Sequence, residues 1–291
     1  MQTGILYALA AHLCWSLFSI YFKALESVPP LEVLLHRMVW SLVFLAGVLT
    51  VQRNWGWLLP ALRRRKLVAG FAASAVLLAL NWFIYIWAVK AGRVVDASLG
   101  YFINPLVNVL FGVLFLRERL RVAQWFAIVL AASGVAWFAF RMGELPWISL
   151  ALAFTFGGYG LLRKTASLGA LEGLTLETLL LFPFSAGALL WFIGHGQSSF
   201  VVATPGIQAL LLAAGPLTSI PLLMFAAGAR RLPLSLLGLL QYINPTIQLL
   251  LGVWLWHEPF DNARLIGFAL IWAALLFYTL ESLFVSKLRR S

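Results

Sequence analysis

Charged residues are scarce in this sequence. Asp, Glu, Lys and Arg make up 11% of its 291 residues, whereas 62% are hydrophobic, and the mean hydropathy is +0.93. Soluble domains carry roughly 25% charged residues and about half apolar ones, so this composition excludes a water-soluble domain. A membrane-spanning helix needs roughly 20 apolar residues. Spans of that length and their joints would use the whole chain, which leaves no room for a large aqueous domain.

Cysteine and catalytic motifs are equally scarce. Cys14 is the only cysteine, so the chain can form neither an internal disulfide nor a cysteine metal site. The sequence has no GxSxG nucleophile elbow, no HExxH zinc helix and no GxxxxGK[ST] phosphate loop. We therefore predict that the protein is not an enzyme, uses no cofactor or metal, and does not hydrolyse ATP by itself.

Apolar runs separated by charged or Gly/Pro-rich joints predict an all-α integral membrane protein with ten transmembrane helices. The first run follows no basic segment and precedes no small-residue cleavage site, so we expect a retained span rather than a signal peptide. The predicted spans are residues 3–23, 30–51, 67–90, 94–116, 123–140, 147–163, 171–193, 207–229, 234–256 and 263–284.

The formal net charge is +11. In a soluble protein this excess would favour a nucleic-acid partner, but here the basic residues lie in the joints between spans. Successive joints fall on alternate sides of the membrane, and 15 of the 21 Lys and Arg residues fall on one side against five on the other. Because Lys and Arg accumulate in cytoplasmic loops, we expect a multi-pass protein with both termini in the cytoplasm and no nucleic-acid partner.

The chain matches itself when it is shifted by 140 residues without gaps. YFINPLVNVLFGVLFLRE (101–118) aligns with QYINPTIQLLLGVWLWHE (241–258), and Asn, Pro, Gly and Glu are among the identities. Each half holds five predicted spans, an odd number, so the second half enters the membrane upside down. This is the inverted-repeat plan of many secondary transporters. We expect one repeat in residues 1–141 and the other in 142–291, packed as one transmembrane unit.

Two stripes of polar side chains lie halfway through the fourth and ninth predicted spans. An amide that faces lipid leaves its donors and acceptors unsatisfied, so each stripe should face protein or a water-filled cavity. The spacing places each stripe on one helical face. We predict that the stripes bind substrate, with interhelical hydrogen bonding as the alternative. They consist of Tyr101, Asn104 and Asn108 in one half and Gln241, Asn244 and Gln248 in the other.

Further polar and aromatic side chains in other spans are candidates for the same site. These are Trp15 and Ser19 in the first span, Asn81 and Tyr85 in the third, and Tyr159 in the sixth. Amide and aromatic groups together suit an amphipathic organic ligand better than a bare ion. We therefore add these five residues to the predicted substrate site.

A few ionisable residues lie inside predicted spans, where an unpaired charge is costly. Arg37 and Glu177 occupy equivalent positions under the 140-residue shift, and they could pair, face a cavity or change partners. One hypothesis is that Glu177 or His36 carries a proton and couples transport to the proton gradient; the other is a purely structural role. Glu118 and Glu258 end the fourth and ninth spans, and we expect them to cap or gate those ends.

Five strings resemble the EamA-type transporters of the drug/metabolite transporter superfamily, and within them the RarD branch. The resemblance covers nearly the whole chain and implies a bacterial inner-membrane permease that exports small organic compounds through a central cavity. It does not define the cargo. The strings are WSLFSIYFKALESVPPLEVLLHRMVWS (15–41), NWFIYIWAV (81–89), GYFINPLVNVLFGVLFLRERL (100–120), YGLLRK (159–164) and LEGLTLETLLLFP (171–183).

The sequence thus predicts a secondary active transporter of small organic molecules or drugs, such as amphipathic metabolites, that works by alternating access. Proton coupling is part of this hypothesis. The alternative is a membrane structural protein or receptor that transports nothing. A selective ion channel is disfavoured because neither a ring of carboxylates nor a carbonyl filter motif is present. The expected partners are a small-molecule substrate and the lipid bilayer, with the oligomeric state left open.

Overall fold

The computed structural model describes residues 2–117, 121–143, 145–229 and 240–288, and all the regular elements in these ranges are helical. The helices are α1 (Gln2–Ser16), α2 (Phe18–Ala24), α3 (Pro30–Val51), α4 (Leu58–Leu62), α5 (Arg65–Lys90), α6 (Val94–Leu116), α7 (Val122–Met142), α8 (Trp147–Thr165), α9 (Ala170–Gly194), α10 (Ser199–Val202), α11 (Pro205–Ala229), α13 (Ile243–Leu250), the π-helix η1 (Leu251–Leu255) and α14 (Asn262–Leu288).

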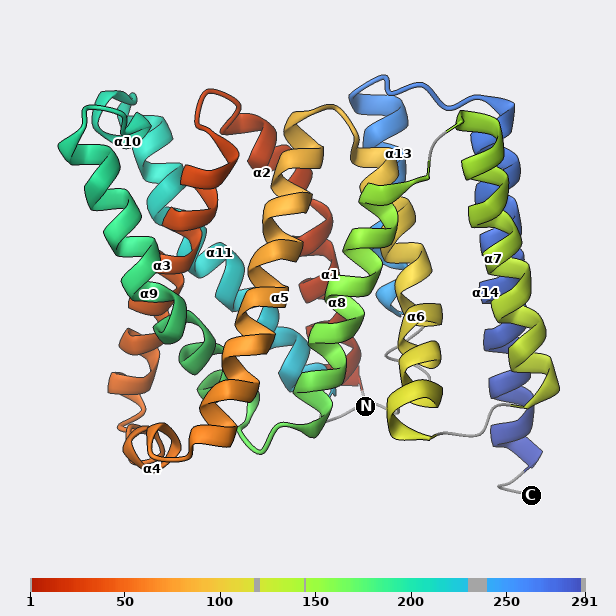
Figure 1. Cartoon of the computed structure of the whole chain (residues 1–291), viewed down its shortest axis with the longest axis horizontal. Coiled ribbons are helices and arrows are strands. Elements are labelled where there is room, and N and C mark those ends of the chain that lie inside the picture. Colours follow the sequence, from red (N-terminus) through yellow and green to blue (C-terminus); the bar gives the residue numbers. More distant parts are fainter. Residues whose placement is uncertain (1, 118–120, 144, 230–239, 289–291) are drawn as a thin grey trace.

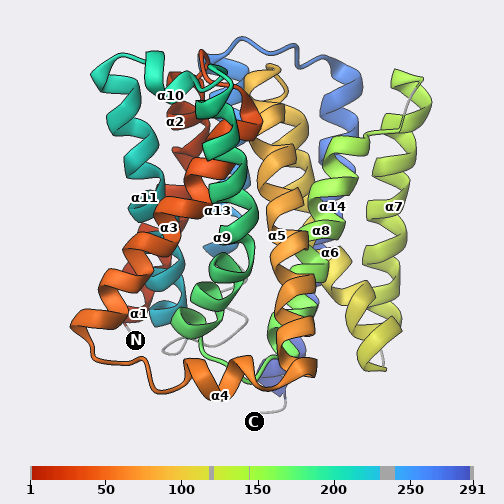
Figure 2. The ribbon, with the colours of Figure 1, turned by 60° about the vertical axis from the view of Figure 1, so that its left-hand side comes forward.

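The long helices lie side by side and reverse direction from one to the next (Figure 1). Their ends form two opposite faces of the molecule, which we call the upper end, where α10 lies, and the lower end, where α4 lies. Figure 2 shows α3 between α9 and α11, and the packing contacts agree. A helix of about 20 residues is about 30 Å long, which matches the thickness of a bilayer core.

Within the described ranges, eight helical segments are long and apolar enough to cross a membrane. The prediction of ten spans is therefore met in part. Of the other two, residues 147–163 correspond to α8, whose apolar character is interrupted by polar side chains such as Thr155 and Tyr159. Residues 234–256 correspond to α13 and η1, a shorter apolar segment, and residues 234–239 lie outside the described ranges.

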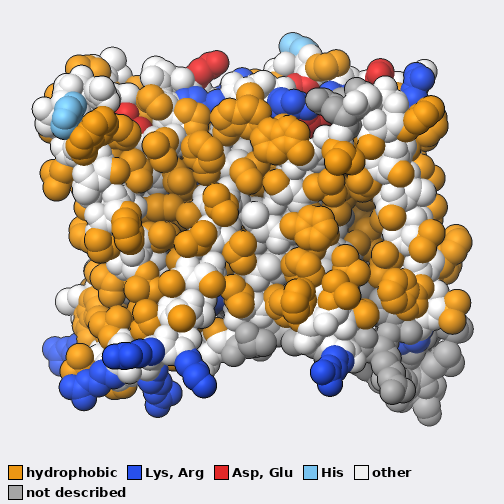
Figure 3. Space-filling view, in the orientation of Figure 1, with side chains coloured by type: hydrophobic (Ala, Val, Ile, Leu, Met, Phe, Trp, Pro, Cys, Tyr) orange, Lys and Arg blue, Asp and Glu red, His pale blue; other side chains and the backbone are white. Residues whose placement is uncertain are grey.

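The surface has the polarity of a membrane protein. Figure 3 shows a broad apolar belt, with basic side chains gathered along the lower edge and acidic side chains at the upper edge. Large hydrophobic residues are exposed in the belt; Phe140 is 81% and Phe184 76% exposed. Such exposure is costly in water and is typical of side chains on the lipid-facing surface of a membrane protein.

Close helix contacts bring the two predicted halves together. The helices α5 and α8 pack against each other, as do α1 and α11, α6 and α8, α1 and α13, and α7 and α14. At Gly215 in α11 a Cβ atom would overlap the backbone of Trp40 in α3, so only glycine permits this approach.

At the upper end, Glu258 binds the beginning of α6. Its two carboxylate oxygens accept hydrogen bonds from the backbone N–H groups of Val94, at 2.7 Å, and Val95, at 2.8 Å. The sequence predicts that Glu258 caps or gates the end of the ninth span. In the structure its carboxylate instead caps the first turn of α6, which is the fourth predicted span. Glu118, for which the same role is predicted, lies outside the described ranges.

Two short helices lie in joints at opposite ends of the molecule, and a glutamate supports each joint. At the upper end, Glu32 accepts hydrogen bonds from the Ser198 hydroxyl and from the backbone N–H groups of Ser199 and Phe200, at the start of α10. At the lower end, Glu172 accepts a hydrogen bond from Asn54, which precedes α4. Glu32 and Glu172 are aligned by the 140-residue shift.

Candidate functional site

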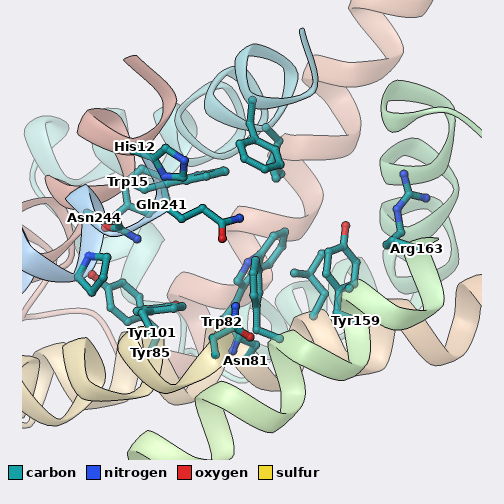
Figure 4. A pocket seen from close by; sticks show the side chains of 18 of the residues that line it. His12, Trp15, Asn81, Trp82, Tyr85, Tyr101, Tyr159, Arg163, Gln241 and Asn244 are labelled. Atoms are coloured by element: carbon teal, nitrogen blue, oxygen red, sulfur yellow. The ribbon is translucent and has the colours of Figure 1, made fainter. Parts of the chain in front are cut away.

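A cavity of about 400 Å³ lies between the helices, and residues from both predicted halves line it. Figure 4 shows side chains from α1 and from the start of α13 facing others from α5 and α8. Its volume lies in the range of about 300–1,000 Å³ that is usual for small-molecule sites. Aromatic rings and a few polar groups make up much of its wall.

Ten of the eleven predicted substrate-binding residues line this cavity, although their role in binding stays a prediction. Ser19 does not line it, because its side chain is fully buried elsewhere among the helices. Of the three predicted coupling residues, Arg37 lines the cavity, whereas His36 and Glu177 do not. The ten residues are Trp15, Asn81, Tyr85, Tyr101, Asn104, Asn108, Tyr159, Gln241, Asn244 and Gln248.

Several buried polar atoms in the cavity wall have no hydrogen-bond partner. They are both ring nitrogens of His12, Nη1 of Arg37, the hydroxyl of Tyr85, Oδ1 of Asn104, Nη1 of Arg163 and Oε1 of Gln248. Buried polar groups are nearly always paired in folded proteins, because an unpaired one loses its hydration without compensation. A cluster of such atoms around one space is typical of a site that water or a ligand fills.

The amide side chains of the cavity differ in how they are engaged. Asn81 in α5 donates to the carbonyl of Leu152 and to the hydroxyl of Thr155 in α8, both at 3.0 Å. Its amide nitrogen therefore connects two helices, as the interhelical alternative predicts. Asn244 accepts a hydrogen bond from Gln248 one turn later, at 2.9 Å. The carbonyl oxygens of Asn104 and Gln248 are buried and have no hydrogen-bond partner.

Arg37 and Glu177 bind different partners. The Nε atom of Arg37 donates to Thr218 at 2.7 Å, and its guanidinium lies 4.0 Å from the ring centre of Trp82. Glu177 accepts a hydrogen bond from Ser74 at 2.6 Å and lies 3.8 Å from the guanidinium of Arg163. Of the possibilities left open by the sequence, a direct Arg37–Glu177 pair is not formed in this structure.

Glu177 is in contact with the cavity through its neighbours. The Tyr159 hydroxyl donates to its Oε2 atom over a long 3.5 Å, and Tyr159 and Arg163 both line the cavity. His36 is placed differently: its Nδ1 accepts a hydrogen bond from Trp40, and its ring packs 5.0 Å from that of Phe200. Its position is therefore among packed side chains rather than at the cavity.

Comparison with known proteins identifies the family. Residues 2–140 match the EamA-like transporter family. The chain is 46% identical over 281 residues to an uncharacterized transporter, YojE, of Bacillus subtilis strain 168, covering 96% of this chain and 94% of the relative. It is 44% identical over 290 residues to the protein RarD of Streptomyces exfoliatus, covering 100% and 92%.

The chain belongs to the EamA-like transporter family. A solved crystal structure of another protein has the same fold, with a TM-score of 0.60, 22% identity, and coverage of 96% of this chain and 98% of the other. The 44% identity to the protein RarD of Streptomyces exfoliatus confirms the resemblance to the RarD branch. This EamA-like protein is a multi-pass membrane protein of a transporter family rather than an enzyme family.

Sequence reasoning overlooked several residues of the cavity in this EamA-like transporter. His12 shares a helical face with Ser16 and Ser19 in the first predicted span, so periodicity indicates it, although only Ser19 of these three is included in the predicted site. Arg163 lies one turn after Tyr159 on the same face of α8, but in the sequence it stands at the end of a predicted span, where a basic residue indicates only topology. Phe225 and Tyr242 carried no recognisable signal, because their place at the cavity depends on how distant helices pack.

The cavity offers no ready metal site. Within the described ranges, no group of three or more His, Cys, Asp and Glu side chains gathers closely enough to hold an ion. His12 packs edge-on against Trp15, at 5.3 Å, and Phe225, at 5.7 Å. The arrangement is thus suited to binding an organic molecule by stacking and hydrogen bonding.

Proposed function

We propose that this protein is a secondary active transporter that exports small organic molecules across the bacterial inner membrane by alternating access. The observation that carries the proposal is the cavity between the two halves, whose aromatic wall holds buried polar atoms without partners. Aromatic faces and amides suit an amphipathic molecule. The membership of a transporter family supports the same activity.

We further propose that the ten spans form two inverted repeats, residues 1–141 and 142–291. Under the 140-residue shift, the contact of α5 with α8 becomes that of α11 with α1, and the contact of α6 with α8 becomes that of α13 with α1. The short helices α4 and α10 occupy corresponding joints at opposite ends of the molecule (Figure 1). Two bundles related in this way can rock about a central site.

In this proposal the structure represents a state that is closed at its upper end. There Glu258 binds the start of α6, and Lys90 donates to the backbone carbonyls of Leu25 and Val28. The cavity instead reaches Arg163 and Ala170, near the lower end, where α8 ends and α9 begins. The excess of basic residues in the lower joints makes this end cytoplasmic. Cargo would then enter from the cytoplasm.

Coupling to protons is assigned to Glu177 rather than His36. Protonation of Glu177 would remove the charge that attracts Arg163, and Arg163 lines the cavity. A proton on Glu177 would therefore change the charge presented to the cargo. His36 contacts Trp40 and Phe200, away from the cavity, which gives it no comparable route to the site.

Counterflow in proteoliposomes tests transport directly. A thermal-shift screen of the purified protein against amino acids, nucleosides and amphenicols first selects a compound that binds. Vesicles loaded with the unlabelled compound should then accumulate its labelled form transiently and saturably, and empty liposomes should not. Binding without counterflow would leave the non-transporting receptor as the better description, and single-channel currents would indicate a pore.

Cysteine labelling tests the orientation. In a Cys14→Ser background, a cysteine replacing the exposed Arg65 at the start of α5 should react only from the cytoplasmic side. A cysteine replacing His195, at the opposite end, should react only from outside. The reverse pattern would contradict the proposed topology.

A further inference from the structure

Arg37 is a buried cation without an acidic partner in the part of the chain that the structure describes. Arg37 is 4% exposed, and within the described ranges its guanidinium donates one hydrogen bond, to the neutral hydroxyl of Thr218. The titratable groups that act on it electrostatically are the phenols of Tyr21, Tyr85 and Tyr101. A phenol is neutral at physiological pH and supplies no countercharge.

The other charges at the cavity compensate each other. The guanidinium of Arg163 lies 3.8 Å from the carboxylate of Glu177, and it also donates to the carbonyl of Gly169. The described charged groups of the site are thus two arginines, Arg37 and Arg163, and one glutamate, Glu177. Their charges sum to one net positive charge. A charge buried at this depth is costly unless a counterion or water accompanies it.

The guanidinium is placed to receive a ligand. Its face rests on Trp82, with ring-centre distances of 4.0 Å to Trp82 and 5.3 Å to Phe18. Stacking of this kind occupies the face of the group and leaves its edge free to donate. Its Nη1 atom is buried, has no partner, and belongs to a residue that lines the cavity. The planar N–H fork of arginine matches the two oxygens of a carboxylate.

The surroundings of Arg37 indicate what the rest of the ligand should be. Trp82, Tyr85 and Tyr101 line the same cavity, and Phe18 continues the aromatic surface. Flat apolar groups pack well against such rings. Uncharged cargo would leave Arg37 uncompensated, and cationic cargo would add repulsion.

We infer that the cargo is an organic monoanion, whose carboxylate binds Arg37 and whose apolar or aromatic body lies against the surrounding rings. The inference rests on the proposed function, since it names the class of molecule that the same cavity transports. It goes beyond the proposed function because it predicts that the cavity binds anions more tightly than neutral molecules or cations. The preference can be measured by binding alone.

Matched acid and amide pairs test the charge preference on the unmodified full-length protein. The probes are 3-phenylpropionate with its amide, indole-3-acetate with its amide, and octanoate with its amide, together with 3-phenylpropylamine as the cation. Isothermal titration should show at least one acid binding about tenfold or more tightly than its amide, which is the effect of one charge-assisted hydrogen bond or more. The amine should bind more weakly than both 3-phenylpropionate and its amide.

Variants then locate the preference. In Arg37→Gln the acid and amide should bind within about twofold of each other, and Arg37→Lys should keep part of the difference because it keeps the charge. Arg65→Gln, at an exposed arginine that does not line the cavity, should keep the whole difference. The ligand series on the unmodified protein remains decisive even if Arg37→Gln fails to fold.

Two results of the binding measurements would overturn the inference. One is amides or the amine binding as tightly as the acids, and the other is no acid binding at all. Saturable counterflow of a neutral amphiphile with no anion preference would remove this inference and leave the transporter function intact. Acid binding that depends on Arg37 but is never accompanied by counterflow would instead support the anion site and count against transport.

Discussion

The carboxylate of Glu258 lies 2.8 Å from the backbone nitrogen of Val95, and its other oxygen binds the preceding N–H group. The first N–H groups of a helix have no partners within the helix and carry a partial positive charge. Glu258, which is more than 160 positions away in the sequence, accepts hydrogen bonds from two of these N–H groups. The contact therefore holds the start of α6 against the segment that follows η1, and closes the upper end of the molecule.

Replacing Glu258 with alanine should loosen this end. Two buried N–H groups would lose their acceptors, so we expect the variant to lose about 1–3 kcal/mol of stability. The measurement is the thermal unfolding midpoint in detergent. Glu281→Gln, which removes a partly exposed ion pair with Arg121, should change the stability by less than about 1 kcal/mol. Equal midpoints for Glu258→Ala and the unmodified protein would show that the cap is dispensable.

The same contact should depend on pH. Burial raises the pKa of Glu258 above its ordinary value of 4.5, and the N–H groups of Val95 and Val94 oppose that shift without cancelling it. A raised pKa in the folded protein means that the protonated form is favoured by folding. The part of the stability that depends on protonation of Glu258 should be complete below pH 4.5 and should be lost as the pH rises through the raised pKa, while the hydrogen bonds from Val94 and Val95 remain. As the pH rises from 4.5 through the raised pKa, the thermal unfolding midpoint of the unmodified protein should fall relative to that of Glu258→Ala.

Glu177→Gln tests proton coupling. The substitution keeps a side chain of similar size that can accept from Ser74, but it removes the charge that attracts Arg163. Transport driven by a pH gradient should fall by an order of magnitude or more, whereas counterflow at equal pH should persist. His36→Ala, away from the cavity, should retain gradient-driven transport. Unaltered gradient-driven transport in Glu177→Gln would assign the coupling elsewhere.

Asn104 and Asn81 should respond differently to truncation. Asn104→Ala removes a buried oxygen that has no partner, so it should cost little stability yet reduce binding of cargo several-fold. Asn81→Ala removes two interhelical hydrogen bonds and should lower stability by about 1–3 kcal/mol. Thermal midpoints and ligand titration measure both effects. Binding that is unchanged in Asn104→Ala and in Asn244→Ala would return the polar stripes to a packing role.

Gly215 is predicted to be irreplaceable in the contact between α11 and α3. An alanine Cβ would overlap the backbone of Trp40, and backbone cannot rotate away, so the helices must separate. We expect a loss of about 1–3 kcal/mol, as for other overpacked sites. Gly187 in α9 has open space around it, so Gly187→Ala should be neutral or stabilise by up to about 1 kcal/mol. Similar midpoints for the two variants would contradict the close approach.

Local periodicity explains why so much of the cavity wall could be predicted. Tyr101, Asn104 and Asn108 share a helical face whatever the tertiary structure, and polar groups at this depth must avoid lipid. The same reasoning misplaced Ser19, which shares a face with His12 but is packed away from the cavity. A helix that contacts neighbours on several sides has more than one protected face, and periodicity cannot tell these faces apart.

Composition, hydrophobic periodicity and the internal match determined by themselves that this chain is a helical membrane protein resembling EamA-type transporters, because these properties depend on residues close in sequence or on simple counts. Tertiary structure alone decided the partners of its buried charges. Arg37 meets Thr218, 181 positions away, and Glu177 meets Ser74, 103 positions away. Such contacts form only when helices pack, and the energy of a buried charge is set by the groups that packing brings to it.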